Sequence, residues 1–393
     1  MSRHGLIPTL ALALASACSS PGGTAADAPD FGFDRAGLLA HLSNDILLPL
    51  QLDFATKAAA LPPAIQAHCD ALDAGTAATT LDTARAAFAA AIDAWQRNEA
   101  LLVGPAETNM STLRGHIYGW PNTSPCEIDR DVASRWADPS SYDVSTELIS
   151  TRSLTAVELL LYPPTDTHNC FDVPAGWDAL GADLPRARCR LALAIATDVA
   201  AQANTLATDW RSDGGNYVAA LATAGSNDTL PSTQHALNLV SDGIFYIDRM
   251  VKDMKLGEAA GIAVNACDAV EMPCLREVEL RYSDRATFAL RANLEITRQA
   301  FTGTTAAGEG PGFDDWLIAA GQPELAARMT ASLDAAITKA NALPDSFLGA
   351  LDTQYADVAA LHGSVRAFTD DLKSQFLTIL ALEIPDDVAT DND

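Results

Sequence analysis

The sequence has few basic residues and almost no strand-like patterning. Lys and Arg total 25 against 51 Asp and Glu, which gives a formal net charge of −26 over 393 residues. A chain this acidic repels phosphate backbones and anionic lipid headgroups, so nucleic acid is excluded as an expected partner. It favours cations or cationic partners, although an acidic surface that only keeps the protein soluble explains the same excess. Alternation of apolar and polar residues, the pattern of a half-buried strand, is nearly absent as well.

Motifs of catalytic metal centres and activated serines are missing too. None of the seven histidines lies in an HxxE or HExxH pattern, and no cysteines have CxxC or zinc-finger spacing. Zinc catalysis ordinarily requires three protein ligands and an open fourth position. There is no GxSxG, and the glycine-rich segment at 308–312 follows no strand, which argues against a phosphate-binding loop. These absences disfavour a metallopeptidase and a nucleophilic hydrolase.

The first eighteen residues have the layout of an export signal. A basic start at Arg3 precedes the apolar run 6–14, and small residues follow at 15–17, directly before Cys18. The run is too short to span a bilayer as a mature helix. The cysteine makes 1–18 resemble a bacterial lipoprotein signal, in which Cys18 is lipidated and becomes the first mature residue. Ordinary cleavage that leaves a free thiol is the alternative.

Residues 19–32 suit a flexible tether. The stretch SSPGGTAADAPD is small, polar and rich in proline and glycine. Ser19, rather than an aspartate, follows the cysteine, which by resemblance to sorted lipoproteins indicates the outer membrane. We therefore expect an outer-membrane lipoprotein that faces the periplasm or the cell surface and touches the membrane only through its N-terminal lipid.

Six further cysteines form an even set, which in an exported chain indicates disulfides and allows fifteen pairings. They are Cys69, Cys126, Cys170, Cys189, Cys267 and Cys274. Short separation along the sequence favours the pairs Cys170–Cys189 and Cys267–Cys274, and this leaves Cys69–Cys126.

The rest of the chain predicts an all-α fold. Apolar residues recur with helical spacing in 83–102 and 365–382, and the abundant alanine favours helix directly. Further helical segments are expected at 35–60, 62–73, 129–137, 144–162, 184–212, 231–255, 284–301, 313–319, 323–342 and 345–361. Helices with short connections pack as antiparallel bundles. A change of composition at 211–232 predicts two helical bundles, 33–212 and 213–393.

Two glutamates lie on the apolar faces of predicted helices. Glu158 shares its face with Leu154 and Leu161, and Glu99 lies on the stripe that contains Trp95. An unpaired buried carboxylate costs several kcal/mol, so such a group is protonated, hydrogen-bonded, paired with a cation or bound to a metal.

Partners for these carboxylates are available in the segment 111–132, which contains Arg114, His116 and Tyr118. A structural Arg–Glu pair that fixes helix register is one interpretation, and a ligand or ion site is the other. If Arg114 pairs with Glu158, the substitution Glu158→Leu leaves a buried guanidinium unpaired, at a cost of roughly 3–5 kcal/mol.

Seven segments, in order, make the chain resemble the imelysin-like family of exported bacterial proteins. They are DILLPLQLDF (45–54), AWQRNEALLVGP (94–105), RGHIYGWP (114–121), TAVELLLY (155–162), MKLGEAAG (254–261), VELRYS (278–283) and RANLEITRQAFTG (291–303). The resemblance covers about 35 to 385. It implies two four-helix-bundle-like halves with a cleft between them, a location outside the cytoplasm and, for many members, a role in iron acquisition.

The family's GxHxxE motif, the basis of its peptidase label, is degenerate in this chain. Ser153 and Thr155 stand in place of the glycine and the histidine, and only Glu158 remains. Threonine is a poor zinc ligand, and His116 is the nearest candidate to replace the histidine. The resemblance also places Glu279 and Ser283 on the family's cleft, although a helix-cap role explains both residues equally well.

We therefore expect an exported binding protein associated with iron or metal acquisition rather than an active protease. Its predicted ligand site comprises Glu158, Thr155, Glu99, Arg114, Tyr118, Trp120, Glu279 and Ser283, with Glu158 and Glu99 as the candidate metal ligands. Hard oxygen donors suit Fe(III) better than zinc, whereas Arg114 argues for an anion or a buried ion pair. Expected partners are a small ligand or metal ion and an outer-membrane uptake protein. A structural or scaffolding lipoprotein and a divergent metallopeptidase are the alternatives.

Overall fold

The computed structural model describes residues 31–140, 142–268 and 272–385. Within these ranges the chain is helical and has no strand, apart from one isolated bridge between Thr305 and Gly308. The all-α prediction is confirmed. The predicted signal 1–18, its lipidated Cys18 and most of the tether 19–32 lie outside the described residues. No helix in the described ranges is long and apolar enough to cross a membrane.

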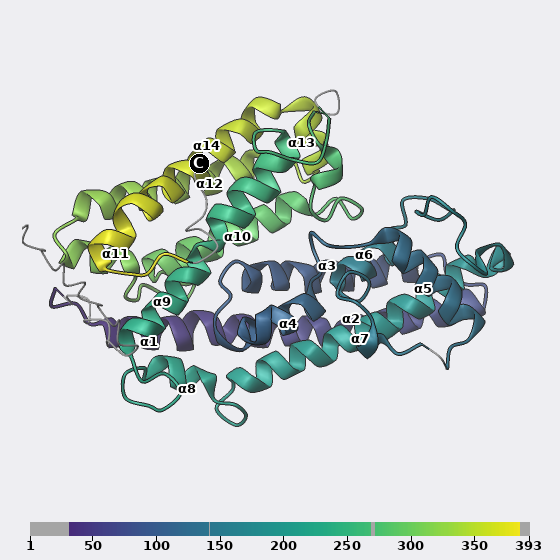
Figure 1. Cartoon of the computed structure of the whole chain (residues 1–393), viewed down its shortest axis with the longest axis horizontal. Coiled ribbons are helices and arrows are strands. Elements are labelled where there is room, and N and C mark those ends of the chain that lie inside the picture. The colour runs from purple at the N-terminus through teal and green to yellow at the C-terminus, as the bar shows by residue number, and fades with distance from the viewer. Residues whose placement is uncertain (1–30, 141, 269–271, 386–393) are drawn as a thin grey trace, which may run out of the picture.

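Three long helices form the body of the first half of the chain (Figure 1). They are α2 (Leu48–Asp73), α3 (Thr80–Glu99) and α7 (Leu184–Trp210). Helix α2 packs against both of the others, and ring contacts such as Phe54 with Trp95, 5.0 Å between centroids, fill the space between them. The shorter helices α4 (Thr108–Ile117), α5 (Pro125–Ala137) and α6 (Leu154–Leu161) pack on this body.

The second half is built around α10 (Ala286–Thr302), α12 (Pro323–Ala342) and α14 (Tyr355–Asp371). The π-helix η6 (Ile247–Glu258) packs on α14 and α10. Shorter elements complete this half: α11 (Phe313–Ala319), α13 (Phe347–Thr353), the π-helix η9 (Leu372–Phe376) and α15 (Leu377–Leu380). Phe301 on α10 meets Phe368 on α14 edge to face, with ring centroids 5.5 Å apart.

The two halves meet along α3 and α10, which are in contact. Two helices that follow residue 213, α8 (Tyr217–Ala222) and α9 (Thr233–Ile244), pack on α1 (Arg35–His41) near the start of the described chain (Figure 1). The π-helix η1 (Leu42–Leu47) joins α1 to α2. The division into 33–212 and 213–393 stays a prediction.

Two predicted helices differ from the structure. The break expected at Pro62–Pro63 is absent, since α2 runs through both prolines. Leu61 and Ile65 on either side are fully buried, and this packing offsets the lost backbone hydrogen bonds. The helix expected over 144–162 is reduced to α6 and a short 3-10 turn at Val144–Thr146; Ser and Thr residues between them favour turns over helix.

The three disulfides confirm one predicted pair and correct two. Cys267–Cys274 is confirmed. The pairs Cys170–Cys189 and Cys69–Cys126 are wrong, because the structure joins Cys69 to Cys189 and Cys126 to Cys170. Cys69 lies near the end of α2 and Cys189 near the start of α7, and these two helices pack side by side. Packing of helices 120 residues apart in sequence therefore outweighs the short separation on which the prediction relied.

Candidate functional site

The predicted site residues fall into two adjoining groups. One is a buried ionic cluster at the contact of α3, α10 and η6. It consists of Gln96, Glu99, Arg114, Tyr118, Lys255, Glu279 and Asn293. The other is the Glu158 site, which consists of Thr155, Glu158 and Ser283 together with the small cavity beside them.

Lys255 is the centre of the ionic cluster. Its side chain is 1% exposed, and its Nζ lies 3.0 Å from Oε1 of Glu279. The same nitrogen donates to Oε1 of Gln96 at 2.7 Å and to Oδ1 of Asn293 at 2.8 Å. Three acceptors thus surround an ammonium group that has three protons to donate.

Two aromatic rings cover the same ammonium group. The Nζ of Lys255 lies 5.9 Å from the ring centroid of Trp120 and 5.3 Å from that of Tyr246. Both distances are within the range of a cation–π contact. Trp120 was predicted as a ligand-site residue, and the structure places it beside the cluster and also on the wall of the cavity next to Glu158.

Glu279 is fully buried and receives several donors on one oxygen. Its Oε1 accepts from the Tyr118 hydroxyl at 2.6 Å and from Nε2 of Gln96 at 3.1 Å. Burial raises the pKa of Glu279, and Lys255 opposes that rise. Burial also raises the pKa of Tyr118 well above its usual value, which keeps the phenol proton available for donation. The second oxygen of Glu279, Oε2, is buried and has no hydrogen-bond partner among the described residues.

Glu99 is also fully buried, and its partner is Arg114. The Nη2 of Arg114 donates to Oε1 of Glu99 at 2.5 Å, and Nζ of Lys255 lies 4.0 Å from Oε2. Burial disfavours the guanidinium charge, but the Glu99 carboxylate outweighs it and the pKa of Arg114 is raised. Two carboxylates therefore face two cations, so the cluster is close to neutral although it is buried.

Lys255, Gln96 and Asn293 were not predicted as site residues. All three occur in segments on which the family resemblance rests, MKLGEAAG, AWQRNEALLVGP and RANLEITRQAFTG. Gln96 and Asn293 are polar residues on otherwise apolar helix faces, which is the signal that identified Glu99 and Glu158. Lys255 gives no such local signal, and its meeting with the other two is not visible in the sequence.

Glu158 is buried as predicted, but its partner is not Arg114. Its residue is 3% exposed, and Oε1 accepts from the backbone N–H of Ser283 at 2.9 Å and from the Ser283 hydroxyl at 2.6 Å. Burial raises the pKa of Glu158 to about 7, against the opposing effect of the Ser283 hydrogen bonds. The Arg–Glu pair that the sequence left open forms between Arg114 and Glu99, so the condition that Arg114 pairs with Glu158 is not met.

Ser153 and Thr155, at the two replaced positions of the degenerate motif, form a chain of hydroxyl groups with Thr123. Oγ of Ser153 lies 2.8 Å from Oγ1 of Thr155, which also accepts from Thr123 at 2.7 Å. Ser153 accepts from the backbone N–H of Gly119 at 3.1 Å. A Cβ on Gly119 would lie 2.5 Å from a carbonyl oxygen of Ile149, so only glycine fits at this close approach. These contacts hold the Gly119 segment against the start of α6.

A cavity of about 120 Å³ lies beside Glu158. Thr155 and Trp120 line it together with Glu158, and the side chains of Arg276 and Arg281 reach the same space. Its volume suits a few water molecules or a small ion rather than a large ligand. Arg281 donates to the Tyr282 hydroxyl at 2.7 Å, which orients one of the two guanidinium groups at the cavity.

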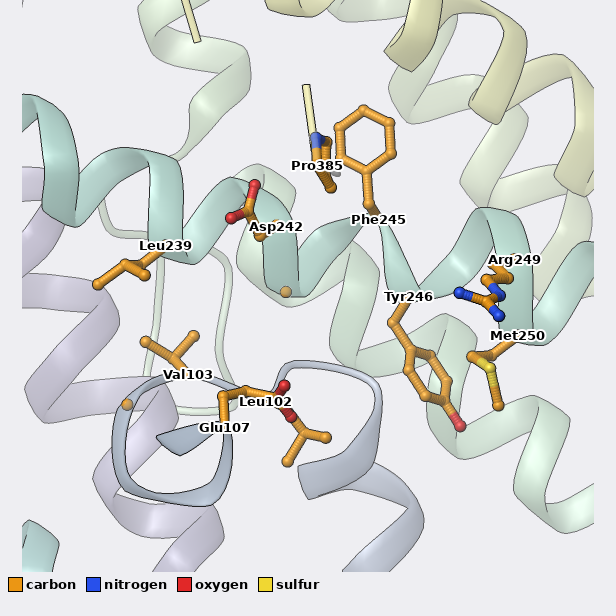
Figure 2. Close-up of a pocket in the computed structure, with 12 residues that line it drawn as sticks. Leu102, Val103, Glu107, Leu239, Asp242, Phe245, Tyr246, Arg249, Met250 and Pro385 are labelled. Atoms are coloured by element: carbon orange, nitrogen blue, oxygen red, sulfur yellow. The ribbon is translucent and has the colours of Figure 1, made fainter. Parts of the chain in front are cut away.

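A larger cavity of about 450 Å³ adjoins the ionic cluster at Tyr246. Figure 2 shows its walls, with Leu102 and Val103 following α3 and with Leu239 and Phe245 from the α9 side. Tyr246 lines this cavity, and its ring also covers Lys255. The cluster thus adjoins two cavities, one through Tyr246 and the other through Trp120.

The donor sets at these two groups do not fit a metal centre of the usual kind. In the parts of the chain that the structure describes, no group of three or more His, Cys, Asp or Glu side chains could hold a metal ion. Glu99 is engaged by Arg114 and Lys255, and Thr155 is engaged by other hydroxyls. Metal binding by Glu158 and Glu99 stays a prediction.

The contact between Ser283 and Glu158 can be interpreted in two ways, as an activated serine or as a closed turn. A hydroxyl that donates to a carboxylate with a pKa of about 7 is the arrangement that activates a serine nucleophile. The backbone N–H of Ser283 donates to the same oxygen, however, which is the pattern of a turn closed by a carboxylate.

A family model described as Imelysin, peptidase M75, matches residues 52–375. The chain belongs to the imelysin family. Among solved structures it is similar to an imelysin-like protein from Psychrobacter arcticum 273-4, with 15% identity and a TM-score of 0.65 over 89% of this chain and 96% of the other.

A second imelysin-fold neighbour is a putative iron-regulated protein A precursor from Parabacteroides distasonis ATCC 8503. It is 18% identical, with a TM-score of 0.68 over 92% of this chain and 98% of that one. No curated protein matches the sequence. The likeness to both structures confirms the imelysin fold predicted from the seven segments.

Proposed function

We propose that this imelysin is an exported, membrane-tethered binding protein that serves iron acquisition and does not act as a protease. Membership of the family and the likeness to a putative iron-regulated protein A precursor support the iron-related role. The export signal and Cys18 support secretion and a lipid anchor in the outer membrane. The partner that this role requires is an uptake protein of the same membrane.

The observation that carries the binding role is the burial of Glu158 on the wall of a cavity. Glu158 accepts from the hydroxyl and the backbone N–H of Ser283 and from the backbone of Tyr282, and burial raises its pKa to about 7. A carboxylate held partly protonated at neutral pH loses its proton readily when a cation approaches. Carboxylate oxygens are hard donors that suit Fe(III), and Glu158 would supply one such oxygen at the cavity to iron that brings other ligands of its own, as in a citrate complex.

The proposal against proteolysis rests on the residues at the motif. Ser153 and Thr155 occupy the glycine and histidine positions, and their hydroxyls are hydrogen-bonded to each other. A peptidase zinc would lack the histidine ligand that the motif supplies.

Titration calorimetry with Fe(III) citrate, compared with Glu158→Gln, tests the binding role. The expected result is saturable binding by the parent protein, weakened at least tenfold in Glu158→Gln and unchanged in Glu324→Gln, a control in the first turn of α12. Equal binding by parent protein and Glu158→Gln would overturn the role of Glu158. Chelator-sensitive degradation of unfolded casein would overturn the proposal against proteolysis.

A structural role is the competing function, because Ser283 satisfies Glu158 in the manner of a closed turn. It predicts that Glu158→Gln changes only the melting temperature. A change in Fe(III) affinity, together with higher expression of the protein under iron limitation, would decide against it.

A further inference from the structure

A third cavity lies on the first half of the chain, away from the ionic cluster. It has a volume of about 410 Å³, within the range of small-molecule sites. Helix α5 contributes Arg135 and Trp136, and helix α7 contributes Ala187 and Arg190. Pro139, just after α5, completes the wall.

Two like charges face this cavity. Arg135 has no ion-pair or hydrogen-bond partner among the described residues, and its Nε is buried and unsatisfied. Its guanidinium lies over the ring of Tyr142, 5.6 Å from the centroid. Burial lowers the pKa of Arg135, and the charge of Arg190 lowers it further. A buried donor on a cation that has no acceptor is unfavourable, and so is the approach of two like charges.

Arg190 is oriented by an acidic residue that does not itself line the cavity. Its guanidinium is paired with Asp73 at the end of α2, where the side chain of Arg190 is 44% exposed. A guanidinium has five N–H groups, so the pair with Asp73 leaves other donors of Arg190 for a ligand in the cavity that this residue lines. Asp73 thus fixes the position of the second cation beside the first.

Both helices that carry the arginines are fixed by disulfides. Cys126 in the first turn of α5 is bonded to Cys170, and Cys189, adjacent to Arg190, is bonded to Cys69. These links join α5 to the loop that contains Cys170 and α7 to α2, and α5 also packs directly on α7. A site that is held in place before binding loses less conformational entropy when a ligand arrives.

Trp136 gives this cavity an aromatic wall in addition to the two arginines. Trp136 is half-buried against the core and offers a flat apolar surface next to the two cations. Guanidinium groups bind carboxylates in two-pronged fashion, and indole rings stack on planar groups. A single negative charge on a flat body matches this surface better than a dianion, because Asp73 already lies nearby.

We propose that the cavity formed by Arg135, Trp136 and Arg190 binds a small aromatic carboxylate. The carboxylate bridges the two guanidinium groups and relieves their repulsion, and the aromatic ring packs on Trp136. This inference does not depend on the Glu158 site, which lies on other elements.

Titration of the full-length protein with benzoate tests the proposal, with acetate and inorganic phosphate as comparison ligands. We expect saturable benzoate binding that is weakened at least tenfold in Arg135→Gln and in Arg190→Gln. Trp136→Leu is expected to weaken benzoate but to leave acetate unchanged. Arg328→Gln, an exposed arginine that is paired with Asp371 on another helix, is the matched control.

Several results would overturn the proposal. Absence of saturable benzoate binding at millimolar concentration would remove the site. Unchanged affinity in both arginine variants, with circular dichroism showing that they are folded, would place any binding elsewhere. Phosphate or acetate that binds as tightly as benzoate would exclude the stacking role of Trp136. If Arg135→Gln fails to fold, Arg190→Gln alone decides, because its side chain is largely exposed.

Discussion

Two buried carboxylate sites lie side by side in this protein, and they avoid the cost of burial in different ways. In the ionic cluster, Glu99 and Glu279 are matched by Arg114 and Lys255. Glu158 instead receives the hydroxyl and the N–H of Ser283, and no cation pairs with it among the described residues. The first site compensates charge with charge, whereas the second moves the pKa of the carboxyl to about 7.

The difference indicates which site can respond to its surroundings. An ion pair with good geometry in the protein interior is costly to break and changes little with pH near neutrality. A buried carboxyl with its pKa near 7 exchanges its proton in the physiological range and faces a cavity. The ionic cluster therefore suits a structural role at the contact between the two halves, and Glu158 suits binding.

The test with the largest expected effect removes Lys255, the cation at the centre of the ionic cluster. Lys255→Met keeps much of the side-chain volume but leaves Arg114 as the one cation paired with this cluster among the described residues. We expect the free energy of unfolding at pH 7 to fall by about 3–5 kcal/mol, because a buried charge loses its partner. Urea denaturation followed by circular dichroism measures the change.

The double variant Lys255→Met, Glu279→Gln is the control for that measurement. It removes the charge of both partners, so we expect it to recover part of the lost stability. A loss below about 1 kcal/mol in Lys255→Met alone would contradict the view that the cluster is held together by charge pairing.

The next test replaces one glutamate in each site by leucine. Glu99→Leu leaves Arg114, with its side chain 20% exposed, without its carboxylate, and we expect a loss of about 3 kcal/mol. Glu158→Leu removes the acceptor of the Ser283 N–H and hydroxyl and of the Tyr282 backbone N–H but leaves no paired cation behind, so we expect a loss of about 1–3 kcal/mol. This revises the roughly 3–5 kcal/mol expected if Glu158 had paired with Arg114. Equal losses, or the reverse order in chemical denaturation, would contradict the distinction.

A pH series separates the sites further. The folded-state pKa of Glu158 is raised from 4.5 to about 7, so the folded chain holds this proton more tightly than the unfolded chain does. Its contribution to stability is fully present below pH 4.5 and is lost as the pH rises through 7. Between pH 5 and pH 8 the parent protein should therefore lose about 2–3 kcal/mol that Glu158→Gln does not lose.

Stability differences between the parent protein and Glu158→Gln at each pH check this expectation. Other acids with raised pKa values, such as Asp131 and Asp314, affect both proteins alike and cancel in the difference. A difference that stays constant from pH 5 to pH 8 would show that Glu158 does not titrate in this range.

Helical periodicity was sufficient to predict the all-α fold and the burial of Glu99 and Glu158, because an apolar stripe fixes which side of a helix faces inward. It could not identify the partner of each acid. Glu99, Glu127 and Asp129 all lie 13 to 15 residues from Arg114 in the sequence, and its choice of Glu99 depends on how α4 packs on its neighbours. The disulfides failed for the same reason, since Cys69 and Cys189 are brought together by the packing of α2 on α7.

Lys255 illustrates the remaining limit. A lysine in a polar-looking segment is ordinarily read as exposed, and nothing local in MKLGEAAG shows that η6 turns it into the interior. Its burial follows from the contacts of η6 with α10 and α14, which lie far along the chain. Polar residues that meet across such distances become visible only once the helices are placed.

The smallest expected effect concerns the donor that distinguishes the Glu158 site. Ser283→Ala removes the hydroxyl that lies 2.6 Å from Oε1 of Glu158 and keeps the backbone N–H at 2.9 Å. Hydrogen bonds to the ionised form lower a carboxyl pKa, so their loss should raise the pKa of Glu158 further. The variant should lose about 1 kcal/mol of unfolding free energy at pH 8 and less at pH 5, where the carboxyl is already protonated.

If Ser283→Ala is instead destabilised equally at both pH values, the hydroxyl acts as part of the turn and not on the charge of Glu158. Denaturation at the two pH values, with Ser332→Ala on α12 as a serine control whose hydroxyl donates only to a backbone carbonyl, decides between these roles.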